Sequence, residues 1–208
     1  MAKVITFAQQ KGGAGKTTML TQLAVAMKGD ERLALIDLDP QKTLTGWMDA
    51  RIRRTGDADM DLIESSEWRI GVDIGKASRD AGLIMIDCPG NADMMLNKVL
   101  RASDLVLTPA QPSAPDVWAT SATVRMAMKQ GADAWVVLNR VPPRGVIAEE
   151  MAAKIEEDGA DMLAERLGNR ADFAKAFARG AGVTEVARKS KAAGEVEALA
   201  KAVGKLLR

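Results

Sequence analysis

The segment from residue 4 to residue 18 constrains the fold more than any other part of the chain. A short apolar run at residues 4–8 enters a glycine-rich segment at residues 9–16, and a helical pattern follows at once. In a strand, glycine loop and helix unit, backbone N–H groups converge on phosphate oxygens and the helix N-terminus adds partial positive charge. Lys16 would neutralise the β and γ oxygens, and the Thr17 hydroxyl would bind Mg²⁺. The segment therefore predicts a phosphate-binding loop.

Short apolar runs alternate with amphipathic stretches along the rest of the chain. The runs lie at residues 4–8, 33–36, 83–86, 105–108 and 135–138, and the helical patterns at 17–27, 45–54, 92–102, 117–129, 147–157 and 194–207. Runs that are apolar at nearly every position fit strands buried on both faces. The alternation predicts an α/β fold over residues 1–208, a single-domain P-loop NTPase with a mostly parallel, twisted sheet and helices on both faces.

Two segments resist assignment. Residues 55–82 hold an acidic patch and one expected short strand around Leu62. Residues 159–169 fit a helix or a strand equally well, because their apolar positions match both periods.

The composition excludes several kinds of chemistry. The chain has no His and no Tyr, which removes the usual general base and the commonest metal ligand, so catalysis must rest on Asp, Lys, Arg and backbone groups. A single cysteine, Cys88, cannot form an internal disulfide, which fits a reducing cytoplasm. No export signal or membrane-spanning stretch is evident. We therefore expect a cytoplasmic protein without stable membrane insertion.

Three carboxylates follow apolar runs at the expected carboxyl edge of the sheet. Asp37 and Asp39 come after the run at residues 33–36, and Asp87 comes after the run at residues 83–86. Alternate residues of a strand point the same way, so Asp37 and Asp39 would share a direction. Parallel sheets bind their ligands at this edge. Either Asp37 or Asp39 could instead cap the helix that follows.

One departure from the usual phosphate-loop pattern is informative. A strict match would place glycine at position 10, but the chain has Gln10 there, and a second lysine, Lys11, enters the loop. Here the chain resembles the ParA/MinD family of ATPases, which carry such a deviant Walker A box. Residues 107–118 resemble a segment of the small, ParF-like plasmid partition proteins, and their three prolines indicate a fixed loop beside the site. The resemblance covers essentially the whole chain.

The resemblance implies catalytic roles for three residues. Lys11 would reach across a dimer interface to the nucleotide of the partner, and Lys16 would neutralise the phosphates of its own nucleotide. Asp39 would orient the attacking water. Positioning is a sensible role for Asp39 because phosphoryl transfer demands little proton removal in its transition state.

The same resemblance implies an ATP and Mg²⁺ site around the loop. Thr17, Asp37 and Asp87 would hold Mg²⁺, with Asp37 supporting its shell and Asp87 acting through water. Asn139 would read the adenine edge, or else cap a loop. The expected nucleotide-binding residues are Lys11, Gly12, Gly13, Ala14, Gly15, Lys16, Thr17, Thr18, Asn139 and Arg140.

Basic residues are distributed unevenly. The net charge is +1, yet residues 167–208 hold nine Lys/Arg against four Asp/Glu, whereas residues 1–166 hold 20 against 24. A basic face on an acidic body is a candidate contact for a polyanion, although it could be a solvated helical face. The candidates for non-specific DNA binding are Arg170, Lys175, Arg179, Arg188, Lys189 and Lys191.

The expected function is ATP-dependent partition of plasmid or chromosomal DNA. An ATP-dependent homodimer would bind non-specific DNA at the nucleoid, and a ParB-like or ParG-like adaptor would stimulate an otherwise weak hydrolysis and release the DNA. No N-terminal helix-turn-helix domain is expected. Three alternatives stay open: positioning of a protein cargo such as chemoreceptor clusters, a MinD-like membrane-associated ATPase, and an ATP-dependent metabolic ligase of the same superfamily.

Overall fold

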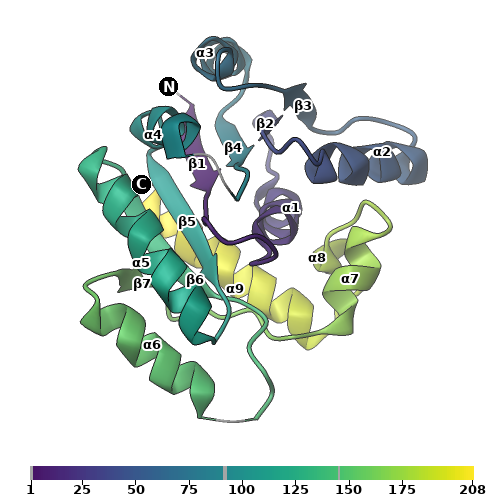
Figure 1. The fold of residues 1–208 in the computed structure, drawn as a ribbon. Coiled ribbons are helices and arrows are strands. Elements are labelled where there is room, and N and C mark those ends of the chain that lie inside the picture. The colour runs from purple at the N-terminus through teal and green to yellow at the C-terminus, as the bar shows by residue number, and fades with distance from the viewer. Residues whose placement is uncertain (1, 91–92, 145) are drawn as a thin grey trace.

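The apolar runs form the strands of one parallel sheet. The computed structural model describes residues 2–90, 93–144 and 146–208. In these residues seven strands, all parallel, lie in the order β3-β2-β4-β1-β5-β6-β7 (Figure 1). The strands are β1 (Lys3–Phe7), β2 (Leu33–Asp37), β3 (Asp61–Glu64), β4 (Leu83–Asp87), β5 (Leu105–Ala110), β6 (Asp133–Leu138) and β7 (Asp161–Met162). The expected α/β fold with a parallel sheet is confirmed.

Helices cover both faces of the sheet. They are α1 (Lys16–Met27), α2 (Thr43–Thr55), α3 (Ile70–Asp80), α4 (Asp93–Arg101), α5 (Ala114–Lys129), α6 (Ile147–Glu157), α7 (Ala171–Phe177), α8 (Val183–Val186) and α9 (Lys191–Leu206). Apolar side chains of α3 to α6 pack in one cluster, and those of α1, α2 and α7 to α9 pack in another, on the opposite face (Figure 1). Within the described residues, no helix is long and apolar enough to span a bilayer.

Strand residues feed the two clusters alternately. Ile36 and Ile84 join the α3 to α6 side, whereas Leu35 and Met85 join the α1 and α9 side. Successive side chains of a strand point to opposite faces, so a strand that is covered on both sides must be apolar at nearly every position. This requirement explains why the central strands could be read directly from unbroken apolar runs.

The parallel register brings the functional ends of three strands to one edge. Asp87 at the end of β4 pairs in register with Asp37 of β2 on one side and with Phe7 of β1 on the other. The phosphate-binding loop leaves β1 at this same edge and enters α1 at Lys16. The fold therefore sets two carboxylates directly beside the loop.

The segments that resisted assignment hold short elements. The strand expected around Leu62 is confirmed as β3, but residues 70–80 form α3, which the pattern did not predict. Residues 159–169 contain only the two-residue strand β7, and helices α7 and α8 were also not predicted. The helix expected at residues 92–102 is α4, although Ala92 lies outside the described residues.

The prediction of a fixed loop at residues 107–118 was wrong. Pro109 lies inside β5, and Pro115 lies in the first turn of α5. β5 pairs with β1 only from Leu105 to Leu107, so the missing N–H of Pro109 interrupts no ladder with β1, and its carbonyl accepts a bond from the Gln9 side chain at 3.2 Å. Proline is also well suited to the first turn of a helix, where its N–H would have no partner.

Candidate functional site

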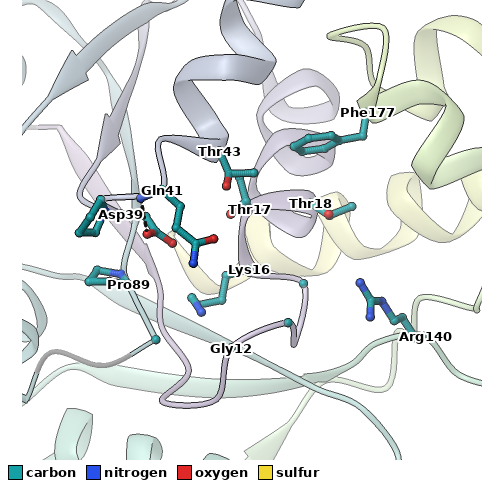
Figure 2. A pocket seen from close by; sticks show the side chains of 14 residues that line it. Gly12, Lys16, Thr17, Thr18, Asp39, Gln41, Thr43, Pro89, Arg140 and Phe177 are labelled. Atoms are coloured by element: carbon teal, nitrogen blue, oxygen red, sulfur yellow. Dashed lines mark hydrogen bonds between the residues drawn. The ribbon is translucent and has the colours of Figure 1, made fainter.

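A cavity of about 490 Å³ opens above the phosphate-binding loop at the carboxyl edge of the sheet. Figure 2 shows it with Lys16 and Thr17 on one side, Asp39 and Gln41 on another, and Arg140 and Phe177 beyond. Its lining consists of Gly12, Gly13, Gly15, Lys16, Thr17, Thr18, Asp39, Pro40, Gln41, Thr43, Pro89, Gly90, Arg140 and Phe177. The structure thus brings most of the expected phosphate-site residues to one place.

Gly15 is required at the start of α1 for two reasons. Its φ is +98°, a left-handed conformation that L side chains rarely adopt. A Cβ placed on Gly15 would also stand 2.3 Å from the Asn139 side-chain nitrogen. That amide donates to the Ala14 carbonyl at 2.8 Å, and its oxygen accepts from the Arg140 backbone at 2.9 Å. These contacts correspond to the alternative in which Asn139 caps a loop, and they hold the phosphate-binding loop in place.

The two lysines of the loop have different environments. Lys16 is buried, and its Nζ donates to the Gln9 carbonyl at 3.3 Å. The Lys11 side chain is 41% exposed, and its Nζ forms an ion pair with the buried Asp116 on α5. Burial alone would raise the pKa of Asp116, but hydrogen bonds from Lys11 and Ser113 outweigh it and leave this pKa below its usual value. Lys16 therefore lines the cavity, whereas Lys11 is not among its lining residues and pairs with α5 instead.

Thr17 and Asp87 form the part of the site that fits a magnesium ion. The Thr17 hydroxyl donates to Asp87 Oδ2 at 2.7 Å, while Oδ1 of Asp87 is buried and has no hydrogen-bond partner among the residues that the structure describes. Burial raises the pKa of Asp87 to about 7, with a further contribution from the Asp37 carboxylate. An orphaned buried carboxylate oxygen beside a threonine hydroxyl suits a hard cation that takes most of its remaining ligands from phosphate and water.

Asp37 is engaged with the helix that follows it. Its two carboxylate oxygens accept from the Asp39 backbone at 3.0 Å, the Thr45 backbone at 3.0 Å and the Thr45 hydroxyl at 2.8 Å. These bonds satisfy N–H groups at the start of α2, as a capping carboxylate does. Within the described residues, no group of three or more acidic or cysteine side chains could hold a metal ion, so Mg²⁺ would need phosphate and water ligands as well.

Asp39 faces the cavity from the loop between β2 and α2 (Figure 2). Its Oδ1 accepts from the Gln41 backbone at 2.9 Å, which fixes the direction of the carboxylate. The Asp39 backbone donates to Asp37 at the end of β2, and Lys42, which has a positive φ of 54°, pairs with Glu64 at the end of β3. Asp39 is thus held at the cavity by backbone hydrogen bonds, and its carboxylate forms no ion pair with any residue that the structure describes.

A second cavity, of about 570 Å³, adjoins the first and shares Thr18, Arg140 and Phe177 with it. Its other lining residues are Asn139, Leu167, Gly168, Asn169, Arg170, Ala171, Phe173, Ala174 and Ala178. The two phenylalanines come from α7, which the sequence pattern did not predict. The spacing of four residues between Phe173 and Phe177 was the only feature of the sequence that could have indicated this helix. This largely apolar cavity suits a flat aromatic group.

The six basic residues proposed for DNA binding differ in whether they form ion pairs within the described structure. Arg170 is committed to an ion pair with Glu195 of α9. The other five are exposed and form no ion pair with any part of the chain that the structure describes: Lys175, Arg179, Arg188, Lys189 and Lys191. They lie on α7, in the turns around α8 and at the first residue of α9. Five free cations thus gather on the C-terminal part of the fold.

Comparison with known proteins places the chain in a family. The family model for the CobQ/CobB/MinD/ParA nucleotide binding domain matches residues 5–183. Maintenance of carboxysome distribution protein A from Halothiobacillus neapolitanus is 30% identical over 200 residues, which cover 93% of this chain and 92% of that protein.

Solved structures agree with this assignment at the level of the fold. A McdA–ATP complex from Cyanothece superposes with a TM-score of 0.80 at 17% identity, over 98% of this chain and 96% of that one. The cell division ATPase MinD of Pyrococcus furiosus superposes with a TM-score of 0.81 at 19% identity, over 99% and 100% of the two chains. The phosphate loop, the sheet order and these matches agree, and the chain belongs to the CobQ/CobB/MinD/ParA family of P-loop nucleotide-binding proteins, which includes the ParA and MinD positioning ATPases.

Proposed function

We propose that this protein binds ATP with Mg²⁺, hydrolyses it to ADP and phosphate, and uses the bound nucleotide to join two copies of the chain. The observation that carries the proposal is the pair of lysines in one phosphate-binding loop, with Lys16 buried in the cavity and Lys11 exposed and paired with Asp116. A triphosphate clasped between two copies would present oxygens that Lys16 and Mg²⁺ do not cover. Lys11 of a second copy would reach them after leaving Asp116.

The residues of one copy would supply most of the chemistry. Backbone N–H groups of the loop and the ammonium of Lys16 would hold the phosphate oxygens, and Thr17 with Asp87 would hold Mg²⁺. The metal ion would neutralise charge on the β and γ phosphates. Asp39 would orient a water for attack on the γ-phosphorus as the bond to the β–γ bridging oxygen breaks. ADP then leaves with that oxygen, and the proton of the water ends on phosphate.

The second cavity is the proposed site of the base. It opens next to Thr18, immediately after the phosphate-binding residues, and Phe173 and Phe177 give it an apolar wall. Arg140 lies between the two cavities, where it would contact the nucleotide between the phosphates and the base (Figure 2). Asn139 would hold the phosphate-binding loop in position next to the base, because its amide already bonds to Ala14 and Arg140.

The exposed cations of the C-terminal part are the proposed non-specific DNA surface, and they would place the protein on the nucleoid in the cytoplasm. Phosphate contact needs positive charge and little base readout. Closing a dimer would double the number of DNA phosphates that the protein contacts. The logarithm of DNA affinity falls by about 0.9 for each contacted phosphate per tenfold rise in salt concentration. DNA binding would therefore depend steeply on dimerisation and on salt. A ParB-like or ParG-like adaptor would stimulate hydrolysis and reverse the binding.

Two cargoes are consistent with this cycle. The ParF-like character of residues 107–118 favours segregation of plasmid or chromosomal DNA. The near full-length similarity to a carboxysome distribution protein favours a large protein assembly as the second candidate. Identifying proteins retained by an ATP-trapped Asp39→Ala variant distinguishes them, since a centromere-binding protein supports the first cargo and an assembly component supports the second.

A MinD-like membrane role has less support. The apolar residues that would form a membrane anchor at the end of α9 pack in the core instead, with Val203 fully buried and Leu206 and Leu207 partly buried against the same cluster. A ligase role would require a second substrate to be consumed together with ATP, and no observation favours it over simple hydrolysis.

Dimerisation provides the direct test of the proposed function. Light scattering after size exclusion, with Mg²⁺ and a non-hydrolysable ATP analogue, is expected to show a doubled mass for the wild type and the monomer mass for Lys16→Ala. Lys129→Ala, which alters an exposed lysine at the end of α5, serves as the matched control and should dimerise normally. A wild-type protein that stays monomeric while it binds the analogue would refute the proposal.

A further inference from the structure

Trp68 is the most exposed large apolar side chain on the described surface. It lies in the turn between β3 and α3 and is 85% exposed. The ammonium of Lys98 on α4 stands 5.0 Å from the ring centroid, and the same ammonium pairs with Glu67 at 3.4 Å. A cation against one face holds the ring in place and leaves the other face to solvent. The Trp68 ring is therefore held in one orientation, with one apolar face exposed to solvent.

Trp68 begins a continuous outer stripe along α3. Helical hydrogen bonds start at Ser66, which accepts from Ile70, so Trp68 belongs to the same helical spiral as the residues that follow. Positions 72, 75 and 79 then lie on one face with it at intervals of three or four, and position 76 lies beside them. Val72 is 59% exposed, and residues 75, 76 and 79 are exposed as well. We call this set the α3 platform: Trp68, Val72, Gly75, Lys76 and Arg79.

The opposite face of α3 is fully used by the fold. Ile70, Ile74 and Ala77 are buried in the cluster against β2 and β4. The platform residues are not needed to attach the helix, and an exposed, contiguous apolar patch on a soluble protein indicates an interaction site more often than an isolated exposed side chain does.

Two glycines on α3 also indicate that its outer face is an interaction site. Gly71 and Gly75 lie on the outer side of α3, and nothing stands within 4 Å of a Cβ placed on either one. Each glycine inside a helix costs roughly 1 kcal/mol relative to alanine. Nothing within the described structure requires them, but the absent side chain of Gly75 lowers the surface between Val72 and Arg79, so that another chain can approach the helix closely.

The charges on the platform select the chemistry of its partner. Lys76 and Arg79 are exposed and form no ion pair with any residue in the described ranges, whereas the neighbouring Lys98 and Arg69 are paired with Glu67 and Asp73. Asp80, one helical turn beyond Lys76, is also exposed and interacts electrostatically with Arg32, so the net charge of Lys76, Arg79 and Asp80 is positive. Two copies of the platform facing each other would bring four cations against only two carboxylates, those of Asp80, and this net repulsion disfavours a second copy as the occupant.

We propose that the α3 platform docks a segment of a partner protein in which apolar side chains are followed by carboxylates. The apolar side chains cover the open face of Trp68 and Val72, and the carboxylates meet Lys76 and Arg79. Along the helix, Lys76 and Arg79 lie roughly 12 and 16 Å from Trp68. In a helical partner that runs parallel to α3, the carboxylates would therefore follow the apolar anchor by about 8 to 11 residues. None of the platform residues lines the nucleotide cavity, so this proposal stands apart from the proposed function.

A pair of synthetic peptides tests the proposal on the full chain. One helical peptide carries leucines followed at the stated spacing by glutamates, and the second carries lysines in place of those glutamates. In calorimetric titrations at low salt, the wild type is expected to prefer the acidic peptide by at least about tenfold. Trp68→Ala should lose at least about tenfold in affinity for the acidic peptide, and a Lys76→Glu, Arg79→Glu double variant should prefer the basic peptide.

The control is Lys201→Glu with Lys205→Glu, which makes the same charge change on exposed lysines of α9 and should keep the preference for the acidic peptide. Circular dichroism verifies that each variant is folded. A wild type without preference, or a double variant that does not reverse it, overturns the proposal. It is also overturned if single-stranded DNA or anionic vesicles, rather than the peptide, bind in a Trp68-dependent way, or if Trp68→Ala abolishes self-association of the protein.

Discussion

Replacing Arg51 with methionine should remove about 3 kcal/mol of unfolding free energy at neutral pH. Arg51 on α2 is 1% exposed, yet its guanidinium donates to Asp59 at 2.7 and 2.8 Å and to Glu185 at 3.0 and 2.8 Å. It also donates to the Gly180 carbonyl at 3.1 Å. One buried cation thus joins α2 to the loop that precedes β3 and to α8.

The magnitude follows from what the substitution leaves behind. Removing one partner of a buried ion pair costs roughly 3–5 kcal/mol, because the remaining charge loses its compensation. The side chains of Asp59 and Glu185 are 24% and 27% exposed, so water compensates part of this loss and the lower end of the range applies. Methionine offers no donors, and it also lacks the guanidinium that lies 5.4 Å from the centroid of the Trp47 ring. In a chain of this length, about 3 kcal/mol lowers Tm by roughly 6–12 °C.

The loss should also depend on pH. Hydrogen bonds from Arg51 hold the pKa of Asp59 far below its usual value. Burial alone would raise the pKa of Glu185, but the bond from Arg51 leaves it lowered on balance. A carboxylate with a depressed folded-state pKa contributes stability that is present above its unfolded pKa and is lost as the pH falls through the folded value. The wild type and Arg51→Met should therefore differ most above about pH 5 and converge as the pH falls below about 4.

Urea unfolding followed by circular dichroism at pH 7.5 and at about pH 3 measures both effects. The matched control is Arg54→Met, which also removes a bond to Glu185 at 2.9 Å, but from a side chain that is 32% exposed. Exposed ion pairs contribute about 1 kcal/mol or less, so this variant should be nearly as stable as the wild type. A loss below about 1 kcal/mol for Arg51→Met, or a loss that does not change with pH, would show that the cluster is not held by Arg51.

Three further predictions concern the nucleotide site. Gly15→Ala should abolish ATP binding in a fluorescent-nucleotide titration, because its Cβ would strike Asn139 at a backbone conformation that alanine resists; near wild-type affinity would contradict the assigned geometry. Asp39→Ala should retain ATP and accumulate dimers while phosphate release falls by about 10²-fold or more, and a normal hydrolysis rate would exclude its role towards water. Lys11→Ala should bind ATP as a monomer, and dimers of this variant in light scattering would show that Lys11 is not needed between copies.

The parts of the structure that sequence analysis identified are those in which the signal is local. The strands that form the centre of the sheet are covered on both faces, so each is apolar at consecutive positions and visible without reference to the rest of the chain. The phosphate loop is equally local, since its glycines and Lys16 lie within a few residues. The short edge strands β3 and β7 have no such runs, and they were correspondingly uncertain.

The parts that it missed depend on contacts between distant residues. Asn139 bonds to the Ala14 carbonyl across 125 positions of the chain, and Glu185 meets Arg51 across 134. Helix α7 is only seven residues long, too short for a clear periodic pattern, although its Phe177 completes both cavities. The proline-rich segment was misjudged because the tolerance of Pro109 depends on where the β1 ladder ends, which the segment itself does not reveal.

Asp37 and Asp87 show how position and partners together decide what a carboxylate does. The parallel register places them side by side at the ends of β2 and β4, and both are fully buried. The start of α2 satisfies Asp37 through bonds from Thr45 and the Asp39 backbone, so its charge is stabilised within the fold. Asp87 receives only one such bond among the described residues, from the Thr17 hydroxyl at the start of α1. Its Oδ1 has no partner there, and its pKa rises to about 7. A bound cation would remove that cost, whereas at Asp37 it would have to displace existing bonds. Of the two carboxylates, Asp87 is therefore the one from which Mg²⁺ binding would gain most free energy.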